Sequence, residues 1–306
     1  MANIIFMGTP EFSVPALEEI NLKYGVKCVV TVPDKPQGRG LKLAFSPVKQ
    51  KALELNIPIL QPEKLKDEIF INQLKSYNPD IIVVVAFRIL PKEVFTIPKI
   101  ATFNIHGSLL PKYRGAAPIN HAIINGEKIS GLTTFIIKEK VDTGNILLKK
   151  EIELYDGITA GELHDILMIE APKIAIETIE LLLSGNYVAL PQNESEATPA
   201  PKIFRDFCKI NWNNSAVKIR NFIHGLSPYP GAFTKICDNT VKILRVKISN
   251  HKLESSQFKI TNNNLLIGSI DNALEILEIQ PENKKVMNIK DFINGWRFEK
   301  SGKIEF

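Results

Sequence analysis

The chain has 306 residues, of which 44% are hydrophobic and 23% charged, and its formal net charge is +5 at pH 7. Such values are typical of globular proteins and exclude a disordered or fibrous chain. The longest apolar run, residues 81–87, is too short to cross a bilayer, and the N-terminal segment lacks the basic region and cleavage site of a signal peptide, so we expect a cytoplasmic protein without a membrane partner.

Residues 1–189 alternate short apolar runs with stretches of helical periodicity. This alternation is typical of an α/β domain in which helices cover a mostly parallel, Rossmann-like sheet. We expect strands at six apolar runs, which are residues 3–7, 26–32, 58–60, 80–87, 101–105 and 132–137.

Two helix starts can be predicted from capping residues. Ser46 followed by proline predicts a helix over residues 47–55, because serine accepts from unpaired N–H groups and proline has no N–H to leave unpaired. Thr159 and Glu162 form the pattern of a capping box before a long amphipathic run. That helix is expected to end near Gly185, which suits a left-handed C-terminal cap.

A linker is predicted at residues 190–208, where apolar periodicity ends and proline and small polar residues accumulate. Residues 209–306 contain a short helical stretch and then several strand-like runs, which is typical of a small antiparallel barrel or sandwich.

Positive charge is concentrated in the C-terminal third. From Ile203 onward the chain has 16 Lys and Arg against 10 Asp and Glu, an excess of six positive charges, whereas the preceding part carries an excess of one negative charge. Such asymmetry favours a polyanion-binding domain attached to a neutral one. A merely well-solvated basic surface would give the same charge balance.

Polar side chains gather after two predicted strands. Asn104 and His106 stand at the end of a buried strand, and because side chains alternate along a strand, their amide and imidazole point to the same side. Ligand sites in open α/β sheets lie at the carboxyl ends of strands. Asp142 also follows a strand-like run, and Gly144 would let its loop approach closely, so a carboxylate is expected beside the imidazole.

These residue types suit acyl transfer to an amine. The reaction needs a donor for the developing oxyanion, a proton shuttle, and a group that holds the shuttle in the right protonation state. Asn104, His106 and Asp142 supply these functions in turn, and no metal ion is required. The same side chains would also serve as loop-capping polar groups, and residue types alone leave both interpretations open.

Longer motifs connect these residues with a known family. Residues 108–118 read Ser-Leu-Leu-Pro-Lys-Tyr-Arg-Gly-Ala-Ala-Pro, and together with Asn-x-His before them and Val-Asp-Thr-Gly at 141–144 they resemble the signature of the 10-formyltetrahydrofolate-dependent formyltransferases. Further segments resemble the same family at residues 8–12, 33–40, 210–212 and 225–232. The resemblance spans nearly the whole chain and implies a Rossmann-like formyltransferase domain, followed by an OB-like β-barrel domain that binds tRNA.

The resemblance also implies roles for three groups of residues. The catalytic set would be Asn104, His106 and Asp142; the folate-binding residues Ser108, Leu109, Leu110 and Pro111, with a pterin pocket at Phe87, Arg88, Ile89 and Leu90; and the tRNA-binding residues Lys35, Arg39 and Lys42. The implied formyl donor is 10-formyltetrahydrofolate, and the implied acceptor is the α-amine of initiator methionyl-tRNA. We expect a monomer. The chain departs from the family pattern at residues 86–91, at residues 138–140 and at His224.

The basic loop at residues 33–43 has two interpretations. Its composition alone is typical of an exposed flexible loop, rich in glycine and proline. The resemblance implies that Arg39 reads the end of the tRNA acceptor stem. A guanidinium group suits that task, since it can pair with phosphate and stack on an unpaired base.

Other functions remain as alternatives. A nucleotide-sugar formyltransferase would share the catalytic domain and differ in its acceptor. A glycinamide-ribonucleotide transformylase would lack the last ~100 residues, which exceed what one domain needs, and a non-catalytic RNA-binding protein would not need all three catalytic residue types. Residues 8–10 lack the Gly-x-Gly-x-x-Gly pattern and the chain has no Walker motif, which disfavours binding of NAD or ATP.

Overall fold

The structure is a computed structural model that describes residues 2–37, 42–237, 239–261 and 263–304. The described residues form two compact units. The first contains the chain up to Gly115 together with residues 131–152 and 164–199. The second contains residues 116–130, 153–163 and the chain from Ala200 onward.

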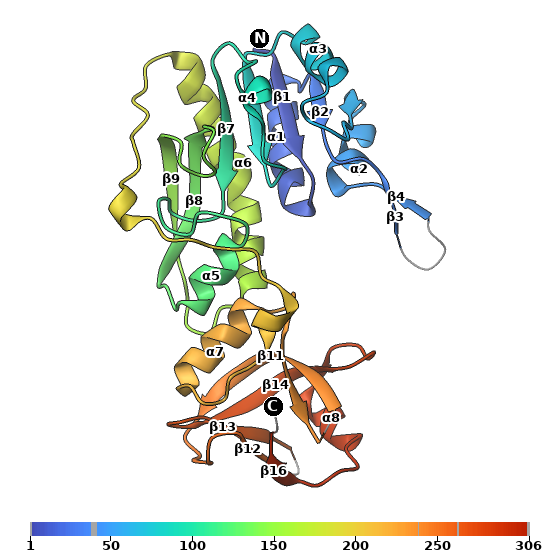
Figure 1. Ribbon diagram of the computed structural model, residues 1–306, viewed down its shortest axis with the longest axis vertical. Coiled ribbons are helices and arrows are strands. Elements are labelled where there is room, and N and C mark those ends of the chain that lie inside the picture. Colours follow the sequence, from blue (N-terminus) through green and yellow to red (C-terminus); the bar gives the residue numbers. More distant parts are fainter. Residues whose placement is uncertain (1, 38–41, 238, 262, 305–306) are drawn as a thin grey trace. The chain divides into compact units, whose positions relative to one another are not determined.

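The first unit is built on a sheet with the strand order β5-β2-β1-β6-β7-β8-β9 (Figure 1). Its strands are β1 (Ile4–Gly8), β2 (Cys28–Val30), β5 (Ile59–Leu60), β6 (Ile81–Val85), β7 (Ala101–His106), β8 (Ile129–Ile136) and β9 (Ile146–Glu153). Neighbouring strands from β5 to β7 are parallel, whereas β7 pairs antiparallel with β8. The predicted α/β fold with a mostly parallel sheet is confirmed; β9 was not predicted.

Strand β6 lies at the centre of this sheet. All five of its residues are apolar and buried, and it pairs with β1 on one side and β7 on the other. A parallel strand covered on both faces needs such a continuous apolar run. Strands β1 and β6 end at the same level, since Gly8 pairs with Val85, and β7 continues one residue beyond the partner of Val85, from Ile105 to His106.

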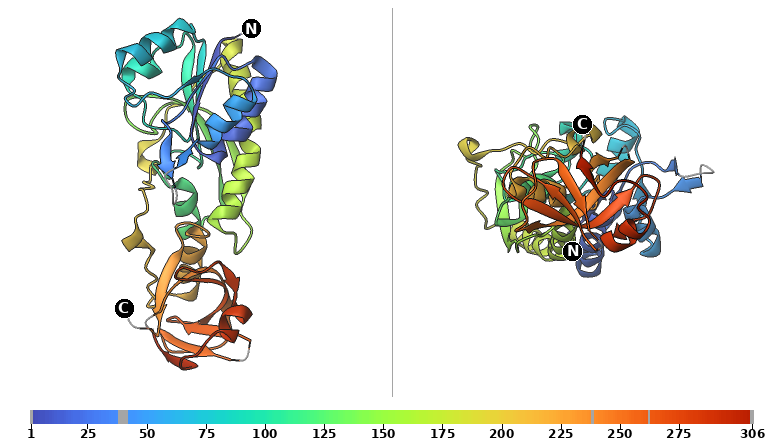
Figure 2. Two further views of the ribbon diagram at one scale, coloured as in Figure 1. Left: turned by 90° about the vertical axis from the view of Figure 1, so that its right-hand side faces the viewer. Right: turned by 90° about the horizontal axis from the view of Figure 1, so that it is seen from below.

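Helices cover both faces of the sheet (Figure 2). The side chains of α3 (Glu68–Ser76) and α4 (Lys92–Phe95) pack against one face, whereas α1 (Val14–Tyr24), α2 (Pro47–Glu54) and α6 (Ala160–Ser184) lie on the other. Both predicted caps are present. Ser46 accepts from the backbone N–H of Lys49 at 3.1 Å, and the backbone N–H groups of Thr159 and Glu162 bind each other's side chains at 2.8 and 3.2 Å.

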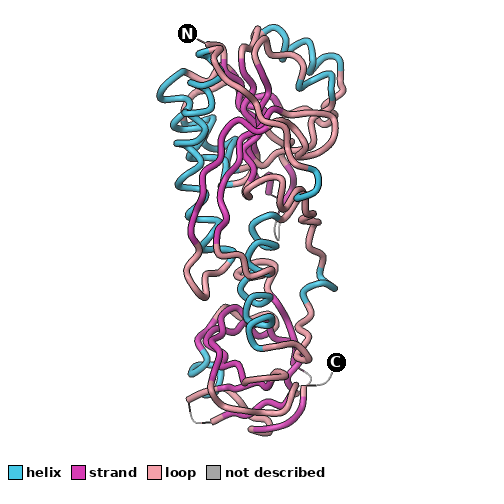
Figure 3. The backbone as a smooth tube through the Cα atoms, turned by 90° about the vertical axis from the view of Figure 1, so that its left-hand side faces the viewer, coloured by secondary structure: helices cyan, strands magenta, loops and turns pink. Residues whose placement is uncertain are grey.

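The second unit is an antiparallel sheet in the order β10-β11-β14-β13-β12-β16, with β15 paired to β14. The strands are β10 (Ala232–Ile236), β11 (Asn239–Ser249), β12 (Gln257–Ile260), β13 (Leu265–Gly268), β14 (Ala273–Pro281), β15 (Met287–Asn288) and β16 (Ser301–Lys303). They curl around one core, as Figure 3 shows, so the predicted barrel-like antiparallel fold is confirmed. Trp212 and Phe258 are the largest fully buried side chains there.

Three helices complete the second unit, namely α5 (Pro118–Ile124), α7 (Ala216–Gly225) and α8 (Ile289–Asn294). Short 3-10 turns lie at η1 (Glu11–Ser13), η2 (Glu194–Glu196) and η3 (Arg205–Cys208). A two-stranded hairpin of β3 (Lys35–Gln37) and β4 (Lys42–Ala44) stands apart from the main sheet. Within the described parts of the chain, every helix is too short or too polar to cross a membrane.

Candidate active site

The end of β7 presents two of the predicted catalytic side chains. Asn104 and His106 are two residues apart on this strand, so both project from the same face. His106 is buried, with 6% of its surface exposed. Asn104 is half-buried, and among the described residues its side-chain amide has no hydrogen-bond partner. The Asn104 amide is therefore free to bind a ligand.

The His106 ring is oriented by a backbone carbonyl. Its Nε2 atom lies 2.8 Å from the backbone oxygen of Tyr113. A carbonyl oxygen can only accept, so Nε2 carries the hydrogen and donates it. The other ring nitrogen, Nδ1, lies 3.8 Å from Oδ2 of Asp142, which is too long for a hydrogen bond. A hydrogen on Nδ1 would therefore remain available to a bound substrate.

Asp142 is held by the backbone of the loop that follows β7. Its Oδ2 atom accepts from the backbone N–H of Gly115 at 2.9 Å, and 12% of its side chain is exposed. The residue adopts a φ of 53°, a left-handed conformation that is uncommon for residues other than glycine. Gly144 lies so close to β8 that a Cβ atom there would meet the backbone oxygen of Ile136 at 1.6 Å. The loop therefore lies tightly against the strand end and brings Asp142 to His106.

The predicted folate-binding loop is fastened by a buried threonine. Thr133 pairs with His106 across β7 and β8, and its hydroxyl donates to the backbone oxygen of Ser108 at 2.7 Å and accepts from the backbone N–H of Leu110 at 3.0 Å. The Ser108 hydroxyl donates to the backbone oxygen of Lys112, and the side chain of Leu110 is fully buried. These two side chains hold the loop, so its backbone is the part left to meet a ligand.

The remaining loop residues differ in exposure. Leu109 is half-buried, and Pro111 is buried. Within the predicted folate-binding loop, the side chain of Leu109 is thus the one with surface to offer.

The predicted pterin segment follows β6. Arg88 donates to the backbone oxygens of Glu63 and Pro62 at 3.0 and 2.8 Å, and its guanidinium lies over the ring of Phe87. Burial lowers the pKa of Arg88. Arg88 is therefore fixed to the protein's own backbone.

Two aliphatic side chains complete this segment. Leu90 is buried against α4, whereas Ile89 is 73% exposed. Ile89 and the half-buried ring of Phe87 are the apolar surfaces that remain available.

The predicted tRNA loop coincides with the β3–β4 hairpin. Lys35 begins β3 and is exposed, Lys42 begins β4, and Arg39 lies outside the described residues. A polar network fixes the base of the hairpin. Lys49 pairs with Asp34 and donates to Gln61 at 2.8 Å, and the hydrogen bond from Lys49 holds the pKa of Asp34 below its usual value.

Three groups at this site were missed by sequence reasoning. They are the backbone oxygen of Tyr113, the backbone N–H of Gly115 and the side chain of Gln192, which donates to the backbone oxygens of Asp142 and Gly144. Backbone groups leave no signal in residue types. Gln192 lies in the segment predicted as a linker, and nothing in its composition pointed to the site.

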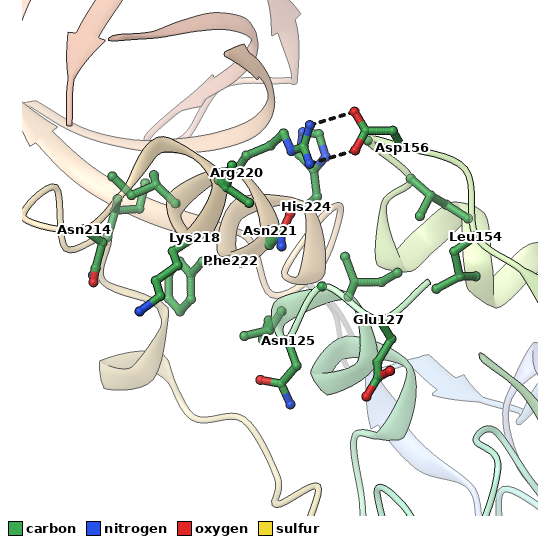
Figure 4. A pocket seen from close by; sticks show the side chains of 18 of the residues that line it. Asn125, Glu127, Leu154, Asp156, Asn214, Lys218, Arg220, Asn221, Phe222 and His224 are labelled. Atoms are coloured by element: carbon green, nitrogen blue, oxygen red, sulfur yellow. Dashed lines mark hydrogen bonds and ion pairs between the residues drawn. The ribbon is translucent and has the colours of Figure 1, made fainter. Parts of the chain in front are cut away.

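The second unit contains a separate pocket of about 640 Å³ (Figure 4). It is lined by the end of α5, by residues 154–158 and by α7. The guanidinium of Arg220 pairs with both carboxylate oxygens of Asp156 at 2.8 and 2.9 Å, and both residues line the pocket. Of the predicted catalytic, folate-binding and tRNA-binding residues that the structure describes, none lines this pocket.

Comparisons with known proteins cover almost the whole chain. Residues 2–179 match the family model described as formyl transferase, and residues 202–297 match the model described as formyl transferase, C-terminal domain. The chain is 48% identical over 305 residues to the methionyl-tRNA formyltransferase of Clostridium acetobutylicum, covering 98% of each protein. It is 47% identical over 297 residues to the enzyme of the same name from Thermodesulfovibrio yellowstonii, covering 96% of each.

Solved structures share the fold at lower identity. A methionyl-tRNA formyltransferase from Clostridium thermocellum matches with a TM-score of 0.57 and 23% identity, covering 82% of this chain and 96% of that one. WlaRD, a sugar 3N-formyl transferase, matches with a TM-score of 0.70 and 23% identity, covering 93% and 99%. The fold alone thus accommodates more than one kind of acceptor.

Proposed function

The chain belongs to the formyl transferase family, and from that premise we propose that it transfers the formyl group of 10-formyltetrahydrofolate to the free amino group of initiator methionyl-tRNA. The product would be the formylated methionyl-tRNA used in translation initiation. Similarity to methionyl-tRNA formyltransferases over 98% of both chains supports this acceptor.

The observation that carries the proposal is the arrangement of His106 between Tyr113 and Asp142. One ring nitrogen is committed to the Tyr113 carbonyl at 2.8 Å, and the other faces the carboxylate across 3.8 Å without forming a hydrogen bond to it. The amide of Asn104, which has no hydrogen-bond partner among the described residues, projects from the same face of β7. An amide, a ring nitrogen and a carboxylate therefore meet at the carboxyl end of a buried strand, where ligands bind in this class of fold.

The proposed reaction begins when the α-amine of methionine attacks the formyl carbon. A carbon–nitrogen bond forms, and the formyl oxygen becomes an oxyanion. The amide N–H of Asn104 and an Nδ1–H on His106 donate to that oxygen, where fixed donors act most strongly. With both ring nitrogens protonated, His106 is a cation and Asp142 is its counter-charge.

The second step breaks the bond between the formyl carbon and N10 of the folate. One proton of the attacking amine must leave and one must reach N10, so that tetrahydrofolate departs as a neutral amine. Asp142 takes up the first proton through a water molecule and returns it toward N10. The 3.8 Å gap between Asp142 and His106 keeps the carboxylate free for this relay.

For the acceptor, we assign residues 209–306 as a tRNA-binding domain, residues 190–208 as the connection and residues 1–189 as the catalytic domain. The excess of six positive charges from Ile203 onward supports binding to a polyanion. Lys35, Arg39 and Lys42 would supply the contacts to the acceptor end.

We also infer that the enzyme acts as a monomer in the cytoplasm, where methionyl-tRNA is used. The buried thiols of Cys28 and Cys208 suit a reducing compartment. Sedimentation of the purified protein tests the monomer, and a dimer at micromolar concentration would contradict it.

The acceptor is tested by supplying 10-formyltetrahydrofolate with one of three acceptors: methionyl initiator tRNA, methionyl elongator tRNA, or an amino-sugar nucleotide. We expect formylation of the initiator tRNA. Formylation of the sugar nucleotide alone would assign the chain to the nucleotide-sugar branch, and formylation of neither would overturn the enzymatic role.

A further inference from the structure

Residues 190–199, which we call the strap, contact both the loop that follows β7 and the loop that carries Asp142. At one end, Leu190 and Ile146 exchange backbone hydrogen bonds of 2.8 and 2.9 Å, so the strap extends the sheet beside β9. At the other end, the Thr198 hydroxyl accepts from the backbone N–H of Tyr113 at 2.9 Å, and its backbone oxygen accepts from Arg114. The strap lies between the two family models, which end at residue 179 and begin at residue 202.

Gln192 is the half-buried centre of the strap. Its Nε2 atom donates to the backbone oxygens of Asp142 and Gly144 at 2.9 and 2.8 Å. Its Oε1 atom accepts from Nε and Nη2 of Arg114 at 3.0 and 2.7 Å. Carbonyl oxygens stand on one side and guanidinium N–H groups on the other, so the amide fits in this orientation alone and all its hydrogen-bonding capacity is used.

These bonds join the two loops that hold the His106 and Asp142 pair. Arg114, which donates to Gln192, stands in the chain between Tyr113 and Gly115. Tyr113 orients His106, and Gly115 donates to the Asp142 carboxylate. The Nε2 atom of Gln192 donates to the backbone of Asp142 itself, a residue with a positive φ. A residue in that conformation keeps it only where its surroundings impose it.

We propose that Gln192 is a positioning residue that sets where the Asp142 carboxylate stands relative to His106. The inference rests on the proposed function, because it needs Asp142 to act in formyl transfer. Gln192 has no place in the chemistry itself. It acts by fixing the loop backbone, and misplacement of a catalytic group by about 1 Å can cost about a hundredfold in rate.

Glu194 provides a matched control on the same strap. It pairs with the same guanidinium, at 2.7 and 3.0 Å, and it reaches the loop of Asp142 only through the exposed Lys140, at 3.9 Å; among the described residues it makes no hydrogen bond to the backbone of Asp142 or Gly144. Gln192→Glu keeps an oxygen for Arg114 and loses the donor to Asp142 and Gly144. Glu194→Gln weakens the pairing with Arg114 and leaves that donor in place.

The first measurement separates kcat from KM. We expect Gln192→Glu to lower kcat roughly tenfold to a hundredfold, with KM for the folate and for the tRNA within about twofold of wild type. Glu194→Gln should retain the wild-type kcat. A wild-type kcat in Gln192→Glu would overturn the inference, and so would an equal loss in both variants.

A double-mutant cycle shows whether Gln192 acts through Asp142. We expect Gln192→Glu to lower the single-turnover rate of formyl transfer at least about tenfold in the wild-type background. In the Asp142→Ala background, the same substitution should lower that rate less than about twofold. The same loss in both backgrounds would mean that Gln192 acts elsewhere. A wild-type rate for Asp142→Ala would instead contradict the proposed function, whatever Gln192 does.

Hydrogen exchange gives a readout that does not depend on activity. The N–H of Gly115 is bonded to the Asp142 carboxylate, so its exchange rate reports how firmly the carboxylate is held. We expect faster exchange of Gly115 in Gln192→Glu than in Glu194→Gln, at an unchanged global unfolding midpoint. Equal exchange in the two variants would overturn the inference even where the cycle is too slow to measure.

Discussion

Nδ1 of His106 faces Oδ2 of Asp142 across 3.8 Å, a gap too long for a direct hydrogen bond. That gap follows from two backbone contacts. Tyr113 takes the opposite ring nitrogen, and Gly115 holds the carboxylate oxygen. The separation of His106 and Asp142 is therefore fixed by one loop that binds both side chains. Each side chain keeps hydrogen-bonding capacity for substrate or water.

Asp142→Asn tests the charge at this position while preserving its shape. The Gly115 N–H can still donate to the new side-chain oxygen, so we expect an almost unchanged thermal midpoint. Loss of a proton-transfer group should lower kcat by roughly 10²- to 10⁴-fold. Steady-state kinetics and thermal unfolding of the same preparation check both statements, and a wild-type kcat would remove Asp142 from the mechanism.

Thr133→Val tests how the loop after β7 is held. The substitution leaves the backbone oxygen of Ser108 and the backbone N–H of Leu110 without their buried partner, which should cost about 1–3 kcal/mol of stability. Because this loop is the proposed folate site, we also expect a higher KM for 10-formyltetrahydrofolate and an unchanged KM for tRNA.

Thr134→Val is the matched control for that substitution. Thr134 is the next residue on β8 and is also fully buried, but its hydroxyl bonds to the backbone N–H of Leu148 and to Thr178 on the opposite face of the sheet. The Thr134→Val variant should be destabilised to a similar degree as Thr133→Val, with an unchanged KM for the folate. If both variants shift the folate KM equally, Thr133 has no special role in the site.

The basic hairpin is tested by replacing Lys35, Arg39 and Lys42 together with alanine. Each lost contact to phosphate should make the dependence of tRNA binding on salt shallower, because fewer counterions are released. We expect KM for tRNA to rise at least about tenfold and KM for the folate to stay constant. An unchanged salt dependence would show that the hairpin does not touch the tRNA.

His224 makes the stability of the second unit depend on pH. The residue is 3% exposed, and its Nε2 atom accepts from the backbone N–H of Val246 at 3.2 Å. Burial lowers the pKa of His224 to about 4, and the positive charges of Arg245 and Arg220 contribute to the decrease. Unfolding would return that pKa to about 6.5.

Between these two pKa values, the unfolded chain binds a proton that the folded chain excludes. The stability contributed by neutral His224 is therefore complete above about pH 6.5 and is lost as pH falls toward 4, by about 1 kcal/mol at pH ~5.5. Urea unfolding should show that the free energy of unfolding decreases more between about pH 7.5 and about pH 5.5 for the wild type than for His224→Gln. An equal loss in both proteins would contradict this origin of the pH dependence.

Much of the fold could be predicted from local patterns. The buried run of β6 and the caps at Ser46 and Thr159 depend on residues close in sequence, and the structure has them as expected. Strand β9 was missed because only its first two residues are buried, the rest alternate between half-buried and exposed, and lysines interrupt its apolar pattern. Its pairing is decided by long-range contacts.

The site was less accessible to sequence reasoning than the fold. Asn104, His106 and Asp142 could be singled out by residue type and by motif. The groups that orient them could not, because two are backbone atoms and the third, Gln192, lies 50 residues from Asp142 in the chain. A segment with the composition of a linker was expected to connect domains, yet its polar side chains bind the catalytic loops.

The central claim is that fixed donors on β7 stabilise an oxyanion during formyl transfer to methionyl-tRNA. Single-turnover formylation of methionyl initiator tRNA by wild type and by Asn104→Ala measures this most directly, because the Asn104 amide has no other partner among the described residues. Loss of one oxyanion donor costs about 2.7–4 kcal/mol, so we expect the rate of the variant to fall roughly 10²- to 10³-fold while folate binding is unchanged. A variant that formylates the tRNA at the wild-type rate would contradict the claim.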